Sequence, residues 1–327
     1  YFPTLALQDF INEIQLQYYQ RFLQDKHPFP CHSFLSSLST LVFYQQYDRV
    51  LTERLEQKIS HIQTLLQQQY FHWDNVCYQL IARGFGLHIN QEPFEKLAHV
   101  TPLSLLHKSR HQPLAIEAIL FGQAGMLAAT YEDPYPKKLQ DIYYHIQSLH
   151  QLTPLKFHEW KLLRLRPPSF PSLRIAQFSA WLSSQNQLMS TFLEARTIKE
   201  LRMCWQFDVS NYWREHYMFE KKSNDFHGKL STAFIDTLIM NAVIPLLFVY
   251  GKINGKEMYC ERAMDFLYQL QPEENHITRT MNASGFPIRH AGDTQAILQL
   301  KKEYCDQHRC LDCSIGYAIM KHASVLS

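Results

Sequence analysis

The fold is decided by residues 33–69, SFLSSLSTLVFYQQYDRVLTERLEQKISHIQTLLQQQ, the longest stretch of helical patterning in the chain. Apolar side chains recur in it every three or four positions, with polar side chains between them. This spacing places the apolar side chains on one face of a single long helix. The apolar face consists of Leu41, Tyr44, Leu51, Leu55, Ile59, Ile62 and Leu66, and the expected solvent side carries Glu53, Arg54, Glu56 and Lys58.

Helix start and stop signals divide the rest of the chain in the same way. A first helix is expected over about Leu5 to Leu23, because prolines 28 and 30 follow it. Asp74 and Asn90 are good N-caps for two further helices, and glycines 84 and 86 end the first of these. Helices are also expected from Pro134 to His150, from Pro171 onward, and from a Ser231 cap to Tyr250.

Composition supports an all-α fold, a multi-helical bundle or array. Only 10 glycines occur in 327 residues, which disfavours a turn-dense β fold. At this length one large domain or two closely packed helical subdomains are both reasonable. The proline group 167, 168 and 171 predicts a boundary, with an N-terminal helical subdomain at 1–165 and a C-terminal helical subdomain with the cysteine cluster at 166–327.

Charge and cysteine usage indicate a compartment. The net charge of +2 gives no global field for a polyanion, so any such site must be local. Seven cysteines, an odd number gathered toward one end, favour a reducing cytoplasm over a disulfide framework. No membrane association is expected, because Asp236, Asn241 and Pro245 interrupt the apolar stretch after Ser231 and make it a buried core helix. The chain opens on Tyr1 without a signal peptide, which suggests a fragment or an incompletely ordered protein.

A cysteine cluster near the C-terminal end is the strongest chemical signal. Cys305, Cys310 and Cys313 lie in the string YCDQHRCLDCSIG. Two thiolates separated by two residues can reach one ion, and Cys305 adds a third ligand from the end of the preceding helix. Zinc accepts such ligands, and the C-x4-C-x2-C run also occurs in plant-type iron–sulfur ferredoxins. The expected cofactor is therefore zinc or an iron–sulfur cluster, and the alternative is a packed turn of reduced thiols.

The fourth ligand has to come from elsewhere in the chain. The candidates are Cys31, Cys77, Cys204, Cys260 and His308. Cys31 is favoured because it sits in a proline-held loop, whereas the other three cysteines fit small buried hydrophobes. His308 lies inside the cluster loop, where sharing the ion is strained. The predicted metal ligands are Cys31, Cys305, Cys310 and Cys313.

An arginine-rich segment, LLRLRPPSFPSLRIAQF, predicts an anion site. Arg166 precedes a proline, which favours extended backbone, and alternation would then place Arg164 and Arg166 on one side. Arg174 would lie in the first turn of the helix that begins at Pro171, where positive charge is unfavourable unless an anion compensates. Together the three arginines could bind phosphate of DNA or RNA. The alternative is that Glu159 or Glu194 pairs with them.

Catalytic signals are missing. No Walker loop, GxGxxG, GxSxG, HExxH or EF-hand pattern occurs, so no catalytic residue is assigned. The string FGQAG at 121–125 fits close helix packing or a helix end better than phosphate binding. A dispersed enzyme site could be assembled only from residues that no spacing connects, namely Glu215, His216, Asp236 and Asn241.

Several strings together resemble a bacterial family, the domain-of-unknown-function family numbered 2851. They are IARGFGLHINQEPFEKLA, IEAILFGQAGML, LLRLRPPSFPSLRIAQF, STAFIDTLIMNAVIPLLFVYGK and DTQAILQLKKEYCDQHRCLDCSIG, spread from Ile81 to Gly316. The resemblance implies further sequence upstream with an acidic pattern similar to restriction-type nuclease cores. In some nucleases an iron–sulfur cluster joins one upstream cysteine to three near the C-terminus, a layout that Cys31 and the C-terminal cluster resemble.

Three functional hypotheses follow. The leading one is a noncatalytic, nucleic-acid-associated helical module with a structural metal. The second is a protein interaction scaffold whose arginines pair internally. The third is enzymatic: the chain is either an accessory region of a nuclease-like enzyme whose catalytic domain lies upstream, or it has a site of its own built from dispersed residues.

Overall fold

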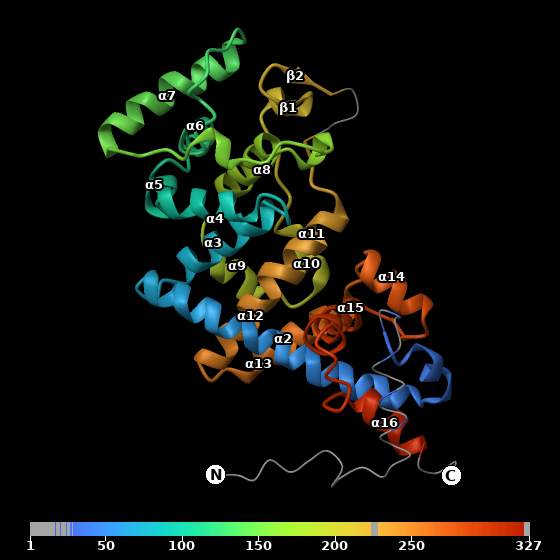
Figure 1. Cartoon of the computed structure of the whole chain (residues 1–327). Coiled ribbons are helices and arrows are strands. Elements are labelled where there is room, and N and C mark those ends of the chain that lie inside the picture. The colour runs from blue at the N-terminus through green and yellow to red at the C-terminus, as the bar shows by residue number, and fades with distance from the viewer. Residues whose placement is uncertain are drawn as a thin grey trace, which may run out of the picture. The chain divides into compact units, whose positions relative to one another are not determined.

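The computed structural model describes residues 29–223 and 228–323, with Gln17, Gln20, Gln24 and His27 before them (Figure 1). The chain forms two compact units: Tyr1–Ser60 with Met264–Ser327, and His61–Ala263. The helix expected over Leu5 to Leu23 falls almost wholly outside the described residues. Residues on both sides of the expected boundary at 165/166 belong to the second unit, and a subdomain boundary there stays a prediction.

The first unit is helical and is built from two distant parts of the sequence. Its elements are the 3-10 helix η2 (His32–Ser37), the first two thirds of α2 (Thr40–Gln68), the end of α13 (Glu257–Gln269), α14 (His276–Ala283), α15 (Ala291–Leu300), the π-helix η7 (Lys301–Cys305) and α16 (Ser314–Ala323). Phe286 lies edge-on to both Phe29 and Phe43, with centroid distances of 6.0 and 5.6 Å. These rings give the unit an aromatic core that joins its N-terminal and C-terminal parts.

Helix α2 confirms the long helix and most of its apolar face. Leu51, Leu55, Ile62 and Leu66 are buried. Leu41 was expected on that face but is 61% exposed, because in the first turn of the helix Phe43, two positions later and so on the opposite side, is the residue that faces the core. Arg54 was expected in solvent, yet it is half-buried and its Nε donates to Gln295 Oε1 at 2.8 Å. The helical periodicity thus predicts which side chains are buried better than it predicts which are exposed to solvent.

The second unit is also helical, with a single two-stranded sheet among its described residues. Its helices are the end of α2, α3 (Trp73–Phe85), α4 (Gln91–Val100), α5 (Leu103–Lys108), α6 (Pro113–Gln123), α7 (Pro134–His150), α8 (Pro171–Ser184), α9 (Leu188–Glu194), α10 (Ile198–Met203), α11 (Thr232–Leu238), α12 (Ile244–Ile253) and the start of α13. Short 3-10 helices are η3 (Phe157–Glu159), η4 (Pro167–Ser169) and η5 (Asn211–Arg214). Strands β1 (His216–Met218) and β2 (Lys221–Lys222) pair antiparallel. The all-α class is confirmed.

One long helix of the second unit is mostly apolar. It runs through α11, the π-helix η6 (Ile239–Val243) and α12, and Ser231 caps it by accepting a hydrogen bond from the Phe234 N–H at 3.2 Å. Residues Thr232–Ile253 have the length and composition of a membrane span: an 18-residue window of this helix has a mean hydropathy of 1.9, and 67% of that window is buried within the protein. Core helices satisfy the same length and composition criteria, and this degree of burial favours the expected core role.

Predicted helix starts are mostly confirmed, but one predicted cap position is wrong, and one correct cap position lacks the side-chain capping hydrogen bond. Pro134 and Pro171 each begin a helix. Asp74 is wrong as an N-cap: His72 holds that position, and Asp74 Oδ1 accepts a hydrogen bond from the Met189 N–H at 2.7 Å. Asn90 holds the predicted cap position of α4, but its side-chain amide pairs with both backbone polar groups of Lys161. Both polar side chains bond to residues distant in sequence instead of capping their own helix.

Candidate metal centre

The four cysteines predicted from the sequence line one cavity in the first unit. Cys31 precedes η2, Cys305 ends η7, and Cys310 and Cys313 lie in the loop before α16. The cavity has about 20 Å³ of interior space, and its other lining residues are Pro30, Tyr304, Arg309 and Gly316. Interior space of this size holds a single water-sized sphere. The structure therefore brings Cys31 to the C-terminal cysteines across most of the sequence.

Burial keeps these thiols in the protonated form. Burial raises the pKa of Cys31 well above its usual range, and the nearby Cys305, Cys313 and Cys310 raise it further. Burial likewise raises the pKa of Cys305 to about 12 and that of Cys310 to about 11. Clustered thiols are difficult to ionise, because each thiolate disfavours ionisation of its neighbours. A shared cation would remove that cost.

Cys313 has the local geometry of a ligand in a turn. Its backbone N–H donates to the Cys310 carbonyl at 3.3 Å, which closes the turn between the two cysteines. Burial raises the pKa of the Cys313 thiol, and hydrogen bonds from the backbone N–H groups of Gly316 and Ile315 oppose that rise. These donors are the first turn of α16, whose positive end favours a thiolate. A Cβ at position 316 would lie 2.2 Å from the Cys310 carbonyl oxygen, so glycine is required for this approach.

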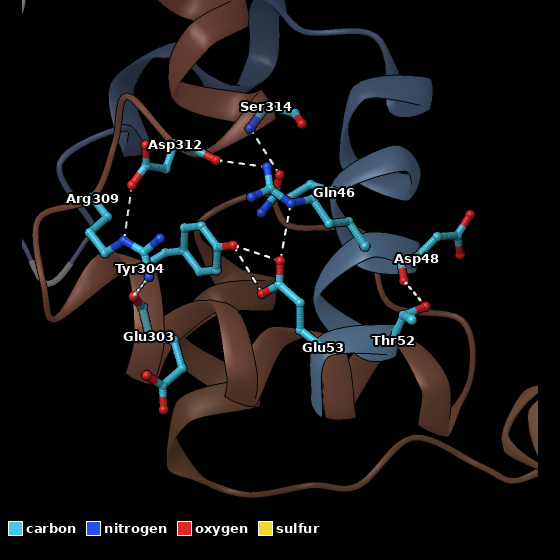
Figure 2. A network of polar contacts seen from close by, with 10 residues as sticks. Gln46, Asp48, Thr52, Glu53, Glu303, Tyr304, Arg309, Asp312 and Ser314 are labelled. Atoms are coloured by element: carbon cyan, nitrogen blue, oxygen red, sulfur yellow. Dashed lines mark hydrogen bonds and ion pairs between the residues drawn. The ribbon is translucent and has the colours of Figure 1, made fainter. Parts of the chain in front are cut away.

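A polar network anchors the cysteine loop to helix α2 (Figure 2). The Tyr304 hydroxyl donates to both carboxylate oxygens of Glu53 at 2.9 Å. Arg49 Nε donates to Glu53 Oε1 at 3.1 Å, and Arg49 Nη1 donates to the Asp312 carbonyl at 3.0 Å. Arg309 Nε donates to the Asp312 carboxylate at 3.0 Å, and its guanidinium lies 4.7 Å from the centre of the Tyr304 ring. The network fixes a chain neighbour of each C-terminal cysteine.

Gln46 holds the start of α16 and leaves one hydrogen-bond donor unused. Its Oε1 accepts the Ser314 N–H at 2.9 Å, on the residue that follows Cys313 (Figure 2). Its Nε2 is fully buried and has no partner among the described residues. Buried amide donors without an acceptor are rare and costly.

The cavity is not a finished coordination shell. Among residues 29–223 and 228–323, no three His, Cys, Asp or Glu side chains are arranged so that they could hold a metal ion as they stand. The four cysteines line a common space but do not form a ligand group as they stand, so binding requires their side chains to rearrange. The other fourth-ligand candidates, Cys77, Cys204, Cys260 and His308, do not line this cavity.

The three predicted anion-binding arginines are not brought together. Arg164 and Arg166 are exposed, and no acidic partner contacts them within the described part of the chain. Arg164 has φ 61°, so the expected extended alternation is wrong there, since a left-handed residue turns the chain. Arg174 is buried, with its guanidinium 3.5 Å from the centre of the Phe234 ring and its Nη1 donating to Gln177 Oε1 at 3.0 Å. Any basic surface in this segment therefore consists of the two exposed arginines.

The glutamates proposed as internal partners are engaged elsewhere or unpaired. Glu159 accepts a hydrogen bond from Lys96 Nζ at 2.8 Å. Glu194 is exposed and has no contact with the arginines in the described residues. Each residue of the enzyme hypothesis has another partner: Asp236 pairs with Arg202, Asn241 with the Thr237 carbonyl, Glu215 with Lys222, and His216 with the Tyr212 carbonyl.

Sequence reasoning missed the residues that support the cysteine loop. Glu53 reads as one more solvent-facing charge on α2, and Tyr304 as part of a helical stripe. Their contact joins positions 251 residues apart, which no local pattern reveals. The pairing of tyrosine and glutamate becomes visible only when the two ends of the first unit are assembled.

Comparison with known proteins places most of the chain in one family. A family model described as "Protein of unknown function (DUF2851)" matches residues 1–276. The matched range includes Cys31 and the arginine segment, and it ends before the three C-terminal cysteines. Neither the curated proteins nor the solved structures contain a match to the chain.

Proposed function

Because the chain belongs to the DUF2851 family, whose function is unknown, we propose a function from the geometry of the first unit. Cys31, Cys305, Cys310 and Cys313 bind a structural metal centre that ties the N-terminal part of this unit to its C-terminal part. The observation that carries the proposal is that all four line one cavity. Ligands from two distant segments let the binding free energy of the metal contribute directly to folding.

Two metal centres fit a four-thiolate ligand set. Zinc needs only a single-ion space, which the cavity already has, together with a C-x2-C turn of the kind that Cys310 and Cys313 form. An iron–sulfur cluster uses the same ligands but is larger, so the cysteine loop would have to open. Arg309, on the cavity wall, offsets the negative charge that either centre acquires from its thiolates.

Metal analysis of anaerobically purified protein tests the proposal. We expect stoichiometric zinc in a colourless protein, or iron and sulfide in a brown one. The variants Cys31→Ser and Cys310→Ser should each lose the metal, and Cys204→Ser, a half-exposed cysteine of the second unit, should keep it. Protein that contains no metal, and takes up neither zinc nor iron and sulfide after reduction, would contradict the proposal. Equal loss in Cys204→Ser would contradict it as well.

A second candidate function is association with nucleic acid. Its support is the pair of exposed arginines, Arg164 and Arg166, which no described acidic residue neutralises. Unpaired arginines on a turn can contact phosphates directly. Arg174 is excluded from this surface by its burial. The cytoplasm is the compartment that suits both proposals, because the thiols must stay reduced and the nucleic acid must be present.

Salt dependence of binding tests the second candidate. We expect labelled DNA or RNA to bind, with an affinity that falls as salt rises. In the double variant Arg164→Ala/Arg166→Ala the slope of log affinity against log salt should fall by roughly 2, since each phosphate contact contributes about 0.9. Arg279→Ala removes one exposed charge from another helix and serves as the control. An unchanged slope would instead favour the protein scaffold or the nuclease-accessory role.

A further inference from the structure

A second cavity is lined entirely by residues of the second unit. It has a volume of about 550 Å³, within the range of small-molecule sites. The end of α2, helices α3 and α4 and the segment at 155–159 form its walls. Leu65, Val100 and Leu155 supply apolar surface, and the polar lining consists of Gln68, Gln79, Glu92, Glu95, Lys96, His99 and Glu159.

Gln79 is the unusual residue of this cavity. The residue is only 6% exposed, yet its side-chain amide has no hydrogen-bond partner among the described residues. Its amide atoms are not completely sealed from solvent, so they are open to the cavity that Gln79 lines. A buried amide left open to a cavity is costly unless water or a ligand satisfies it.

The charges around Gln79 favour a cation. Three carboxylates line the cavity against one lysine. Lys96 Nζ lies 2.8 Å from Glu159 Oε2, and this ammonium lowers the pKa of Glu159. Arg83, outside the cavity, pairs with Glu95. Glu92 is exposed and makes no hydrogen bond or ion pair within the described residues, although its charge helps to raise the pKa of the neighbouring Lys96.

We infer that this cavity binds an aliphatic amine, with its ammonium group held by Glu92 and the Gln79 amide oxygen and its methylene stem against Leu65 and Leu155. The Lys96–Glu159 pair already shows that an ammonium is stabilised at this wall. Amide and carboxylate oxygens satisfy the three N–H donors of an ammonium, and the apolar floor excludes water from the stem. A bare divalent ion is a poorer occupant, because the described residues offer no arrangement of acidic groups that holds one.

Calorimetric titration with 1,5-diaminopentane at fixed ionic strength tests the inference, with 1,5-pentanediol as the neutral probe of equal length. We expect the diamine to bind and the diol to bind at least tenfold more weakly. Glu92→Gln should weaken diamine binding at least fivefold, and Gln79→Leu should do the same if it folds. Glu194→Gln makes the same charge change on an exposed helix of the same unit and should bind like wild type.

Three results would overturn the inference. One is equal binding of diamine and diol, and another is equal weakening by Glu92→Gln and Glu194→Gln, which indicates a diffuse charge effect. The third is binding of a lysine-rich peptide with no binding of the free diamine, which indicates a protein partner. The metal content of these variants stays that of wild type whatever the outcome, so this test is independent of the cysteine site.

Discussion

At the scale of single residues, Glu117 is a buried carboxylic acid that links stability to pH. It is 5% exposed, and its carboxylate accepts hydrogen bonds from the Tyr135 hydroxyl at 2.6 Å and from the Trp213 indole N–H. Burial raises the pKa of Glu117 to about 7, against an ordinary 4.5, although these hydrogen bonds and one from Ser210 oppose the rise. Burial therefore outweighs three favourable contacts.

Glu117 makes the protein less stable as pH rises. A folded-state pKa above the unfolded value means that the favourable contribution is complete below pH 4.5 and is lost as pH rises through about 7. The difference amounts to about 3 kcal/mol. We expect Glu117→Gln, which keeps the acceptor oxygen, to flatten urea-unfolding free energies between pH 5 and pH 8. A wild-type profile identical to that of Glu117→Gln would contradict this, and Glu194→Gln is the exposed control.

Arg174 allows a second prediction at this scale. Burial lowers the pKa of Arg174 to about 9, and its Nε has no partner among the described residues. Replacing a buried charge that lacks a carboxylate partner by an apolar group of similar shape is often neutral or stabilising. We expect Arg174→Met to change the unfolding free energy by less than about 1 kcal/mol or to increase it. Arg174→Lys should be less stable than Arg174→Met, because it keeps the charge and loses the flat contact with Phe234.

Unfolding free energies of the two Arg174 variants test this prediction. A loss above about 3 kcal/mol in Arg174→Met would show that the guanidinium neutralises a buried anion. That result would revive the sequence-based expectation that something negative faces this arginine. The sequence correctly identified Arg174 as an unusual charge at a helix start, but its burial depends on α11, which no local pattern connects to α8.

At the scale of elements, the contact between α6 and α7 depends on one glycine. A Cβ at position 122 would lie 2.1 to 2.3 Å from three ring atoms of Tyr143. Both residues are buried in the second unit. The FGQAG string therefore serves packing, as the sequence suggested, and Gly125 with φ 71° then ends the helix.

We expect Gly122→Ala to destabilise the second unit by about 1–3 kcal/mol, the usual cost of overpacking. The gain in helix propensity from alanine, about 1 kcal/mol, is smaller than the steric cost at the upper end of this range. Thermal unfolding measures the loss. Combining it with Tyr143→Leu should recover part of it, because the smaller side chain makes room. A double variant no more stable than Gly122→Ala would show that backbone strain is responsible.

The starts of helices could be predicted from the sequence, but the hydrogen-bond partners of polar side chains could not. Proline at the first helical position and Ser231 at a cap act through neighbours in sequence, so α7, α8 and α11 begin where expected. Asp74 failed as a cap because its carboxylate reaches an N–H 115 residues away. The cysteine site divides in the same way: the loop from Cys305 to Cys313 is local, whereas its support by Glu53 is not.

At the scale of the whole molecule, removal of the proposed metal should affect the two units unequally. A metal present at 1,000 times its dissociation constant stabilises a folded state by about 4 kcal/mol. We expect a chelator to lower amide-exchange protection in residues 29–60 and 264–323 and to leave residues 61–263 close to their original protection. Uniform loss of protection would contradict this. Cys31→Ser should behave like chelated wild type.

The first unit is assembled from both early and late parts of the sequence, and this sets an order of events during translation. Residues 61–263 leave the ribosome with their own core complete in sequence, whereas Phe29, Phe43 and Cys31 must wait for residues after 264. At about 5–20 residues per second, the delay before the late segment arrives lasts many seconds. During that time the nascent N-terminal segment carries aromatic rings and a thiol that the late part of the chain does not yet cover.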